Sequence, residues 1–272
     1  MKERKFHQIW AYFWLIVLAF VILFPIFVGL WSSLLPTSDI MRGRFVGGHL
    51  SLANYWRAMT TTPILRYLLN SLIISTLTMV FQVLLSSMSA YAFVFLRFPG
   101  RNLLFYLVLA TMMFPFEAEA IPNFQTIRAM NLLNSYSSMI VPFMSTAIGI
   151  FMLRQTFRQV PDDLRKAAAI AGLNHWQFYS KVVMPYSKIS VLTLAAYSFL
   201  TSWNQYLWPM LVTFSDHFRP VQIGLRQMQS ADGFNDWGMI QASAIIVIIP
   251  TIIVLLVGQH FFRARENEGA VK

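Results

Sequence analysis

The sequence contains no cysteine and few charged residues. Without cysteine, the chain can form no disulfide bond, no thiolate metal site and no cysteine nucleophile. Charged residues make up 12% of the 272 positions, about half the share in soluble domains, whereas hydrophobic residues make up 57%. The mean hydropathy is +0.55. This composition excludes an ordinary soluble domain and predicts an all-α integral membrane protein whose apolar runs cross the bilayer as helices.

Sequence signatures of catalysis are also missing. There is no G-x-x-x-x-G-K-[ST] for nucleotide phosphates, no H-E-x-x-H for zinc and no G-x-S-x-G nucleophile elbow. The five histidines are scattered along the chain, and we interpret His175, in a polar segment, as a solvated side chain. A membrane enzyme would need a catalytic constellation, which we do not find. We therefore expect no enzyme activity, and no cofactor or metal bound by this chain.

The net charge of +10 has two possible meanings. A basic chain can bind nucleic acid, but here lysine and arginine flank the apolar runs, which is typical of membrane orientation. If the chain crosses the membrane six times, the segments on the side of the termini hold 14 of the 21 basic residues, and the opposite segments hold 7. The positive-inside rule then predicts that both termini are cytoplasmic, and we expect no nucleic acid partner.

Six apolar runs predict membrane helices, and the first is too long for the apolar region of a signal peptide. The second contains many hydroxyl and amide side chains, so we place it in the bundle interior, where such groups can bind other helices. The connection after the first run contains SLANYWRAM, which we expect to form an interfacial helix. The predicted spans are Ile9–Leu30, Leu68–Leu96, Leu103–Phe116, Ser138–Phe157, Ile189–Phe214 and Met239–Phe262.

Between the fourth and fifth runs lies a polar, positively charged stretch, Val160–Pro185. Its pattern predicts two short helices with a turn between them. Pro161 suits the first position of a helix, Gly172 the residue after its end, and Asn174 the cap of the second helix. We expect Pro185 to end that second helix.

This stretch resembles the EAA loop of binding-protein-dependent ABC importers, in which Glu-Ala-Ala is followed by Gly and then by a hydrophobic helix ending in Pro. Ala167, Ala168, Gly172 and Pro185 match this pattern, whereas Lys166 replaces the usual Glu. The resemblance implies a cytoplasmic coupling helix that docks into an ATPase subunit through four residues, Lys166, Ala167, Ala168 and Gly172. The alternative interpretation is an ordinary amphipathic helix that links two spans.

Other segments resemble the carbohydrate-type permeases of these importers, as in maltose and glycerol-3-phosphate transport. The resemblance implies a type I ABC importer permease fold in the bacterial inner membrane. It implies a conserved five-helix transmembrane domain at 67–262, preceded by a first helix and outer loop at 1–66 and followed by a cytoplasmic tail at 263–272. The matching segments are SLANYW (51–56), NS (70–71), MFPFEAEAIP (113–122), LNSY (133–136), WNQYLWP (203–209) and GAVK (269–272).

The same resemblance implies partners and a substrate class. The transporter would combine this chain with a homologous second permease subunit, two ATP-binding subunits and an extracytoplasmic solute-binding protein, within membrane lipid. ATP and Mg would be bound by the ATPase subunits. The solute would be a sugar or sugar-like molecule (an oligosaccharide, a polyol or glycerol-3-phosphate) that enters the cell by alternating access.

Four residues are candidates for the path of the solute. Asn204 and Gln205 are amides in an apolar run and are costly there without partners, so they either line the path or bind another helix. Trp203 either stacks on a sugar face or anchors the helix at the interface. Glu117, near the end of the third run, either lines the path or is a solvated carboxylate. The sequence leaves each choice open.

A secondary transporter is the competing class. Such a protein would need ion-coupling charges near the middle of the membrane and usually has internal repeats. The sequence has no clear repeat and no acid or base in the middle of an apolar run. The pattern therefore favours an ATP-driven importer.

Overall fold

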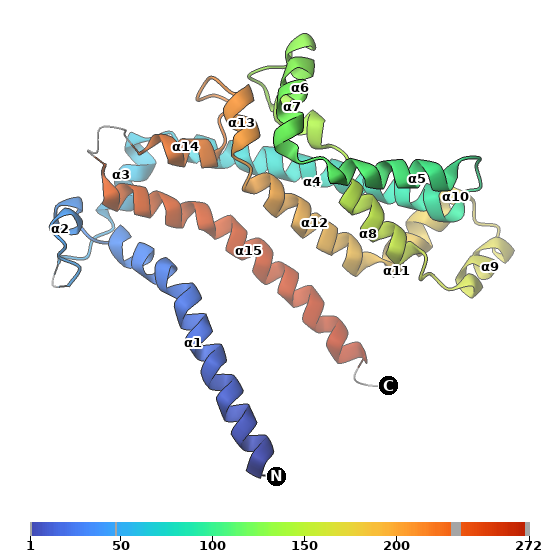
Figure 1. The fold of residues 1–272 in the computed structure, drawn as a ribbon, viewed down its shortest axis with the longest axis horizontal. Coiled ribbons are helices and arrows are strands. Elements are labelled where there is room, and N and C mark those ends of the chain that lie inside the picture. Colours follow the sequence, from blue (N-terminus) through green and yellow to red (C-terminus); the bar gives the residue numbers. More distant parts are fainter. Residues whose placement is uncertain (1, 47, 230–234, 270–272) are drawn as a thin grey trace. The chain divides into compact units, whose positions relative to one another are not determined.

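The computed structural model describes residues 2–46, 48–229 and 235–269, and every regular element in these ranges is helical (Figure 1). The all-α prediction is confirmed for this part of the chain. The chain forms two compact units, each of which we describe by itself. The first comprises Met1–Leu65 and Gly224–Ile249, and the second comprises Arg66–Ile223 and Pro250–Lys272. The last residues of the predicted tail, 270–272, lie outside the described residues.

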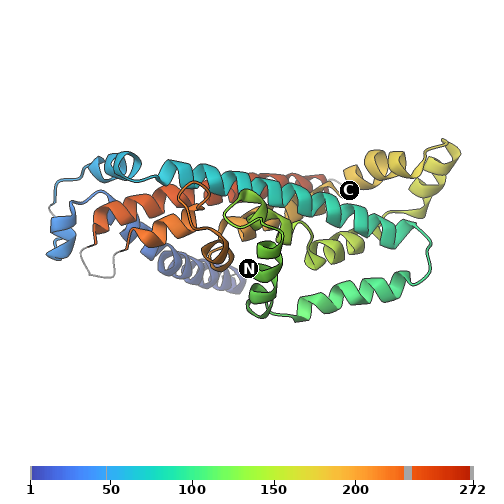
Figure 2. The ribbon, with the colours of Figure 1, turned by 90° about the horizontal axis from the view of Figure 1, so that it is seen from above.

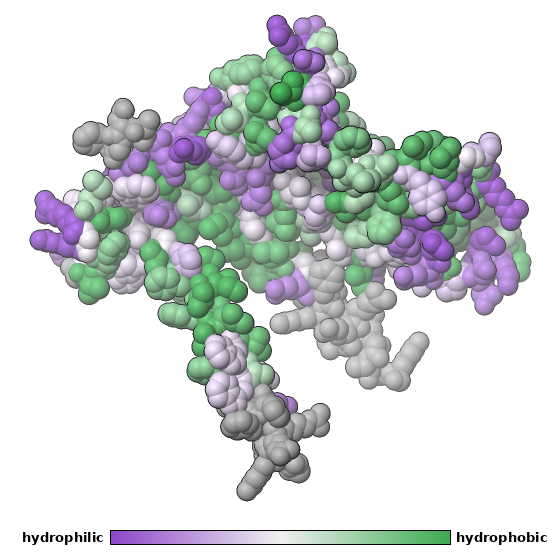
Figure 3. Space-filling model, in the orientation of Figure 1, coloured by the Kyte–Doolittle hydropathy of each residue, from purple (hydrophilic) through white to green (hydrophobic). Residues whose placement is uncertain are grey.

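The first unit contains α1 (Lys2–Ser33), α2 (Thr37–Met41), α3 (Ala53–Thr61) and the beginning of α15 (Trp237–Gly269). The first predicted span lies in α1, and hydrophobic side chains cover the upper part of its visible face (Figure 3). The rest of the chain buries none of the most apolar part of α1. A surface of this kind needs lipid or a protein partner to cover it.

Side chains of α3 hold the C-terminal end of α1. The buried Asn54 donates two hydrogen bonds from Nδ2, to the carbonyl oxygens of Ser33 at 2.9 Å and Leu35 at 2.8 Å. The hydroxyls of Tyr55 and Ser33 share a hydrogen bond of 2.6 Å. These bonds satisfy carbonyl groups that a helix end leaves without partners. Within the segment SLANYWRAM, the helix begins at Ala53, and Trp56 is exposed. Its position at the membrane interface remains a prediction.

The second unit is built around α4 (Ile64–Phe95), which holds the second predicted span. Most of the small polar residues of α4 are buried, as predicted for a helix of the bundle interior, but Thr76 is exposed and Ser89 is half-buried. Buried Asn70 donates from Nδ2 to the carbonyl oxygens of His217 at 3.0 Å and Arg219 at 2.9 Å, and its Oδ1 accepts a bond of 2.7 Å from the Tyr136 hydroxyl. These bonds tie the first turns of α4 to two distant segments. The buried hydroxyl residues are Ser71, Ser75, Thr78, Ser86 and Ser87.

The predicted third span, Leu103–Phe116, is not one straight helix. The chain runs through α5 (Arg101–Ala110) and the 3₁₀ turn η1 (Thr111–Met113), and then bends by 103° into α6 (Phe116–Ala129). Pro115 explains the bend, because the residue before a proline disfavours helical backbone. Phe114 accordingly has φ −84° and ψ 123°.

The next two predicted spans are also interrupted. The short α7 (Tyr136–Ile140) and the 3₁₀ turn η2 (Val141–Phe143), which contains a proline, meet α8 (Ala147–Phe157) at 44°. The chain leaves helical geometry again between α12 (Lys188–Trp203) and α13 (Leu207–Val212). Among the described residues, three helices are long and apolar enough to cross a membrane. Six spans result if each of three bent pairs counts as one, the third being His175–Tyr186 with Lys188–Trp203 at 80°. The six-span prediction agrees with that upper number.

Asn134 of the LNSY segment binds the backbone that follows α13. It adopts φ +55°, and its Oδ1 accepts bonds from the N–H groups of Phe214 and Ser215 at 3.0 and 3.1 Å. Trp208 of α13 donates from Nε1 to the carbonyl oxygen of Ser138 at 2.9 Å. Residues of both segments therefore connect α7 and the turn before it with α13 and the residues after it. The predicted polar loop before α15 also contains a helix, α14 (Val221–Gln227).

Candidate coupling loop and solute path

The stretch Val160–Pro185 folds into short helices, as its sequence predicts. The first, α9 (Asp162–Ile170), has two aspartates in its first turn, where carboxylates meet the positive end of the helix dipole. Pro161 has an extended backbone, with φ −60° and ψ 139°. It therefore precedes the helix as the N-cap residue and is not the first helical residue, which corrects the prediction.

Gly172 ends α9 in the left-handed conformation, with φ +71°. Its N–H donates to the carbonyl oxygen of Ala169 at 3.1 Å, and the N–H of Leu173 donates to that of Ala168 at 3.0 Å. This pair of bonds defines a Schellman motif. A β-carbon at Gly172 would have no atom within 4 Å, so the need for glycine here is conformational and not steric. Its predicted position after the helix end is confirmed.

Asn174 caps the second helix reciprocally. Its Oδ1 accepts from the N–H of Gln177 at 2.9 Å, and Oε1 of Gln177 accepts from the N–H of Asn174 at 3.0 Å. The cap holds α10 (His175–Phe178), which continues through the π-turn η3 (Tyr179–Val183) into α11 (Met184–Tyr186). The predicted cap is therefore confirmed, and the two helices are joined by a fixed turn.

Pro185 lies inside α11, so the prediction that it ends the helix is wrong by one residue. In a regular α-helix, a proline ring clashes with the carbonyl group four residues earlier. The π-turn directly before α11 widens the backbone there and accommodates the ring.

Two tyrosine hydroxyls bind the loop to the C-terminal half of α4. In the ribbon views, the loop lies toward the same end of the unit as the C-terminal end of α4 (Figures 1 and 2). The hydroxyl of Tyr91 lies 3.0 Å from Nδ1 of His175 and donates to the carbonyl oxygen of the same residue at 3.1 Å. Tyr179 and Ser87 share a hydrogen bond of 2.8 Å between their hydroxyls. His175 is exposed, as predicted for a solvated side chain, but one ring nitrogen also contacts α4.

Aromatic packing supports these hydrogen bonds. The rings of Phe95 and Phe178 pack edge to face, with their centroids 5.2 Å apart. Tyr91 and Tyr179 pack in the same way at 5.4 Å. The loop therefore shares a hydrophobic core with α4 and α8, and it can move only together with the ends of those helices.

The outward side of α9 presents one large hydrophobic residue. Ile170 is 89% exposed, and helical spacing puts Ala167, Lys166 and Asp163 on the same side. Nζ of Lys166 lies 3.3 Å from Oδ1 of Asp163 in an exposed ion pair. Ala168 points the other way and is only 7% exposed. This burial corrects the prediction that Ala168 lies on an outward contact surface.

Asn204 and Gln205 lie where α12 ends and the chain breaks before α13. Asn204 is exposed, and its Nδ2 donates to the carbonyl oxygen of Leu200 in its own helix at 2.8 Å. Gln205 is half-buried, and its side chain has no hydrogen-bond partner among the described residues. Neither amide binds a side chain of another helix in this part of the chain. Their role in the solute path remains a prediction.

Trp203 and Glu117 lie in different environments. Trp203 is 1% exposed and stacks on Phe199, with 5.7 Å between centroids, so its ring does not face an open surface of this chain. Its indole nitrogen is buried and has no hydrogen-bond partner among the described residues. Glu117 is exposed in the first turn of α6, directly after the bend at Pro115. No described contact joins Glu117 to Trp203, Asn204 or Gln205, although the neighbouring Phe116 packs edge to face on Trp208 at 6.2 Å.

Two contributors to the loop were missed in the sequence. Tyr91 and Ser87 lie in the second run, about eighty residues before the loop, and nothing local marks them as its anchors. Ile170 had a signal that could have identified it, because it is an isolated large hydrophobic residue beside the glycine that ends a polar helix.

The described residues combine several apolar spans with an exposed polar loop, an organisation typical of a transport permease. Sequence comparison defines the class further. Residues 82–267 match the family described as binding-protein-dependent transport system inner membrane component. The chain belongs to this family, whose members are the membrane subunits of ABC importers.

Similar proteins agree over nearly the full length. The sn-glycerol-3-phosphate transport system permease protein UgpE of Yersinia pestis bv. Antiqua (strain Antiqua) is 34% identical over 271 residues, which cover 96% of each chain. UgpE of Pectobacterium atrosepticum is 32% identical, with the same coverage. A chain in the crystal structure of a bacterial ABC transporter, involved in the import of the acidic polysaccharide alginate, has a TM-score of 0.86 at 23% identity. That match covers 96% of this chain and 98% of the other, and it supports the fold.

These findings define the protein's class. It is a multi-pass membrane protein with the type I permease fold, and it is a permease subunit of a carbohydrate-type ABC importer. Its relatives are transport permease subunits and not enzymes. The family works with a solute-binding protein and an ATPase in general.

Proposed function

We propose that this subunit moves a sugar-like solute into the cell by alternating access, and that glycerol-3-phosphate is the first candidate. Similarity over 96% of the chain to a glycerol-3-phosphate transport permease supports this substrate class. The observation that best supports this mechanism is the hydrogen bond between Tyr91 of α4 and His175 of the loop. Through this bond, a push on α9 and α10 reaches a membrane helix directly.

In this proposal the outward side of α9 receives the ATPase. Ile170 enters an apolar groove of that subunit, because burying a large aliphatic side chain contributes about 2 kcal/mol. Ala167 lets the two backbones approach closely, and Lys166 faces an acidic residue of the partner. Gly172 keeps the turn that sets the angle between the two helices, and Ala168 supports α9 from inside.

The assembled transporter would contain a homologous second permease, two ATPase subunits and an extracytoplasmic binding protein. ATP and Mg would be bound by the ATPase subunits. Both termini and the loop would be cytoplasmic, because basic residues are twice as frequent on that side. Closure of the ATPase pair would then bring the two coupling loops together and reorient the spans.

The solute path would pass the break between α12 and α13. Irregular backbone inside a span is tolerated where it lines a cavity, because its polar groups can then bind water or solute. Gln205 is the strongest candidate contact, since its amide lacks a partner among the described residues. Asn204 lies beside it, and Glu117 and the buried Trp203 are weaker candidates.

The test is uptake by the complete importer in proteoliposomes. We expect ATP-dependent accumulation of labelled glycerol-3-phosphate, with competition by the unlabelled compound. ATP-dependent accumulation of maltose in place of glycerol-3-phosphate would contradict the proposed substrate but not the proposed ATP-driven mechanism. Uptake driven by an ion gradient without an ATPase subunit would overturn the proposal in favour of a secondary transporter.

A further inference from the structure

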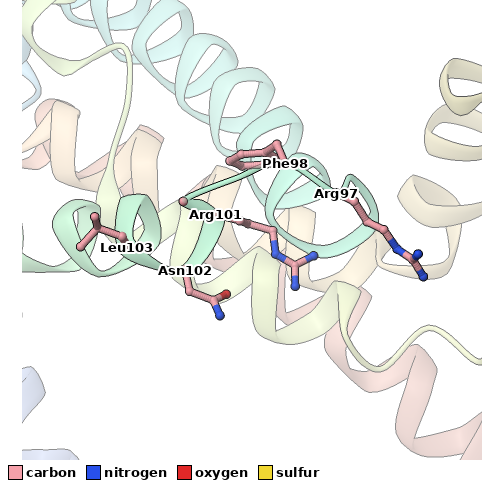
Figure 4. Close-up of a pocket in the computed structure, with 6 residues that line it drawn as sticks. Arg97, Phe98, Arg101, Asn102 and Leu103 are labelled. Carbon is pink, nitrogen blue, oxygen red and sulfur yellow. The ribbon is translucent and has the colours of Figure 1, made fainter.

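A surface pocket of about 480 Å³ lies at the turn between α4 and α5. None of its lining residues belongs to the coupling loop or to the solute-path candidates. Figure 4 shows the side chains of Arg97 and Arg101 extending from this turn, with Leu103 at its other side. The pocket is lined by Arg97, Phe98, Gly100, Arg101, Asn102 and Leu103.

Positive charge is concentrated around this pocket without described counter-ions. Arg97 and Arg101 line the pocket, and Arg154 of α8 lies near enough to Arg101 and Arg158 for their positive charges to repel one another. No ion pair joins any of these four arginines to a described carboxylate. The guanidinium of Arg154 stacks over the ring of Phe105, 3.8 Å from its centroid. Because like charges repel, a bound anion would stabilise this arrangement.

The first turn of α5 adds hydrogen-bond donors to the pocket. Gly100 precedes the helix at φ +74°, and no side chain caps it. The first backbone bond of the helix runs from the N–H of Leu104 to the carbonyl oxygen of Gly100 at 2.9 Å. The N–H groups of the three preceding residues therefore have no acceptor in the described part of the chain. Free N–H groups at the start of a helix suit a phosphate oxygen.

An apolar surface continues from the pocket along α5. Leu103, Leu104 and Leu107 are 65%, 48% and 55% exposed. They belong to a candidate membrane span, so this surface can lie against lipid. A free anion would use the arginines alone, whereas a lipid would use both the cationic pocket and the apolar surface beside it.

We propose that this pocket binds an anionic phospholipid, with the headgroup phosphate between Arg97 and Arg101 and an acyl chain along α5. Basic pockets at the membrane surface are known to recognise such headgroups. The proposal goes beyond solute transport and does not depend on which side of the membrane the turn occupies. The lipid would fix the junction of α4 and α5 at one end of the bundle.

The experiment titrates the purified full-length chain, in neutral detergent, with fluorescent phosphatidylglycerol. We expect Arg97→Gln/Arg101→Gln to weaken binding about thirtyfold, because each arginine near anionic lipid contributes about a fivefold effect. Arg101→Lys keeps the charge and should stay within a few-fold of the native chain. The matched control is Arg128→Gln, which removes an exposed arginine without a described partner at the end of α6 and should have no effect.

Three results would overturn the proposal. The first is unchanged phosphatidylglycerol binding in the double variant. The second is displacement of the lipid by millimolar inorganic phosphate, which would make this a site for free anions. The third is loss of ATPase assembly with lipid binding intact, which would assign the arginines to a protein partner. If the double variant does not fold, Arg97→Gln alone decides, since that side chain has no described partner and its loss should weaken binding about fivefold.

Discussion

The hydroxyl of Tyr91 on α4 donates a hydrogen bond of 3.1 Å to the carbonyl oxygen of His175, the first residue of α10. This bond joins a membrane span to the proposed coupling loop. We expect Tyr91→Phe to weaken the junction by about 1 kcal/mol, the usual net contribution of one hydrogen bond. The number of solute molecules transported per ATP hydrolysed should then fall, because force is lost between the loop and the span.

The assay for this prediction measures uptake and ATP hydrolysis in the same proteoliposomes. Assembly with the ATPase should be retained, since the outward side of α9 is unchanged. Tyr197→Phe serves as the control, because it removes the hydroxyl of an exposed tyrosine without a described partner. An unchanged transport ratio in Tyr91→Phe would contradict the proposed transmission.

Gly172→Val tests the turn of the loop. Valine at φ +71° is strained by about 1–2 kcal/mol, although its side chain has open space. We expect uptake to fall while the chain still inserts into the membrane, because no span is changed. Gly172→Asn should retain most uptake, since asparagine tolerates the left-handed conformation. The measurements are solute uptake and the amount of each variant in the membrane.

Gly43→Val is the matched control for that change. Gly43 has φ +68° and also has open space around it, but it lies between α2 and α3. The strain should be similar, and uptake should be retained. Equal loss of uptake in the Gly43 and Gly172 variants would mean that strain, and not the loop, causes the defect.

Topology can be tested by cysteine labelling, with no background because the chain lacks cysteine. Val46→Cys should react with an impermeant maleimide in intact cells, since Val46 is 90% exposed in the predicted outer connection. Lys181→Cys, on the exposed side of the loop, should react only after the membrane is permeabilised. Labelling of Lys181→Cys in intact cells, with no labelling of Val46→Cys, would contradict the predicted orientation with both termini in the cytoplasm.

Lys166→Glu tests the charge that departs from the usual EAA pattern. The change removes the ion pair with Asp163 and places two acids at i and i+3, which costs a few tenths of a kcal/mol within α9. If Lys166→Glu weakens ATPase binding in a pull-down by more than this small cost within α9, the residue of the ATPase that faces Lys166 is acidic. Charge reversal of that partner should then restore binding, and Lys166→Gln should give an intermediate loss. Normal binding by Lys166→Glu would remove this residue from the contact.

The sequence predicted those parts of the fold that depend on local chemistry. The end of α9 at Gly172 and the cap at Asn174 follow from backbone conformation and side-chain hydrogen bonds within a few residues. The long apolar runs likewise predicted α1, α4 and α15, because their length and composition suit a bilayer.

Features that depend on distant contacts were not predictable in this way. The anchoring of His175 by Tyr91 joins residues far apart in the sequence, and the burial of Ala168 depends on how α9 packs. A proline is present at the bend before α6, at Pro115. A straight span with a proline near its end would have the same local sequence, so the sequence alone does not predict the bend. The π-turn before Pro185 has no clear sequence signal.

The most direct test of the central claim, that Val160–Pro185 is the ATPase-coupling element, is co-purification of the ATPase with the Ile170→Asp variant. Ile170 is 89% exposed, so the change should leave the fold intact and place a charge in the apolar contact. Val46→Asp is the matched control, since Val46 is 90% exposed at a predicted outer position. The account predicts that Ile170→Asp loses most of the bound ATPase and Val46→Asp retains it. Full ATPase retention by Ile170→Asp would contradict the account.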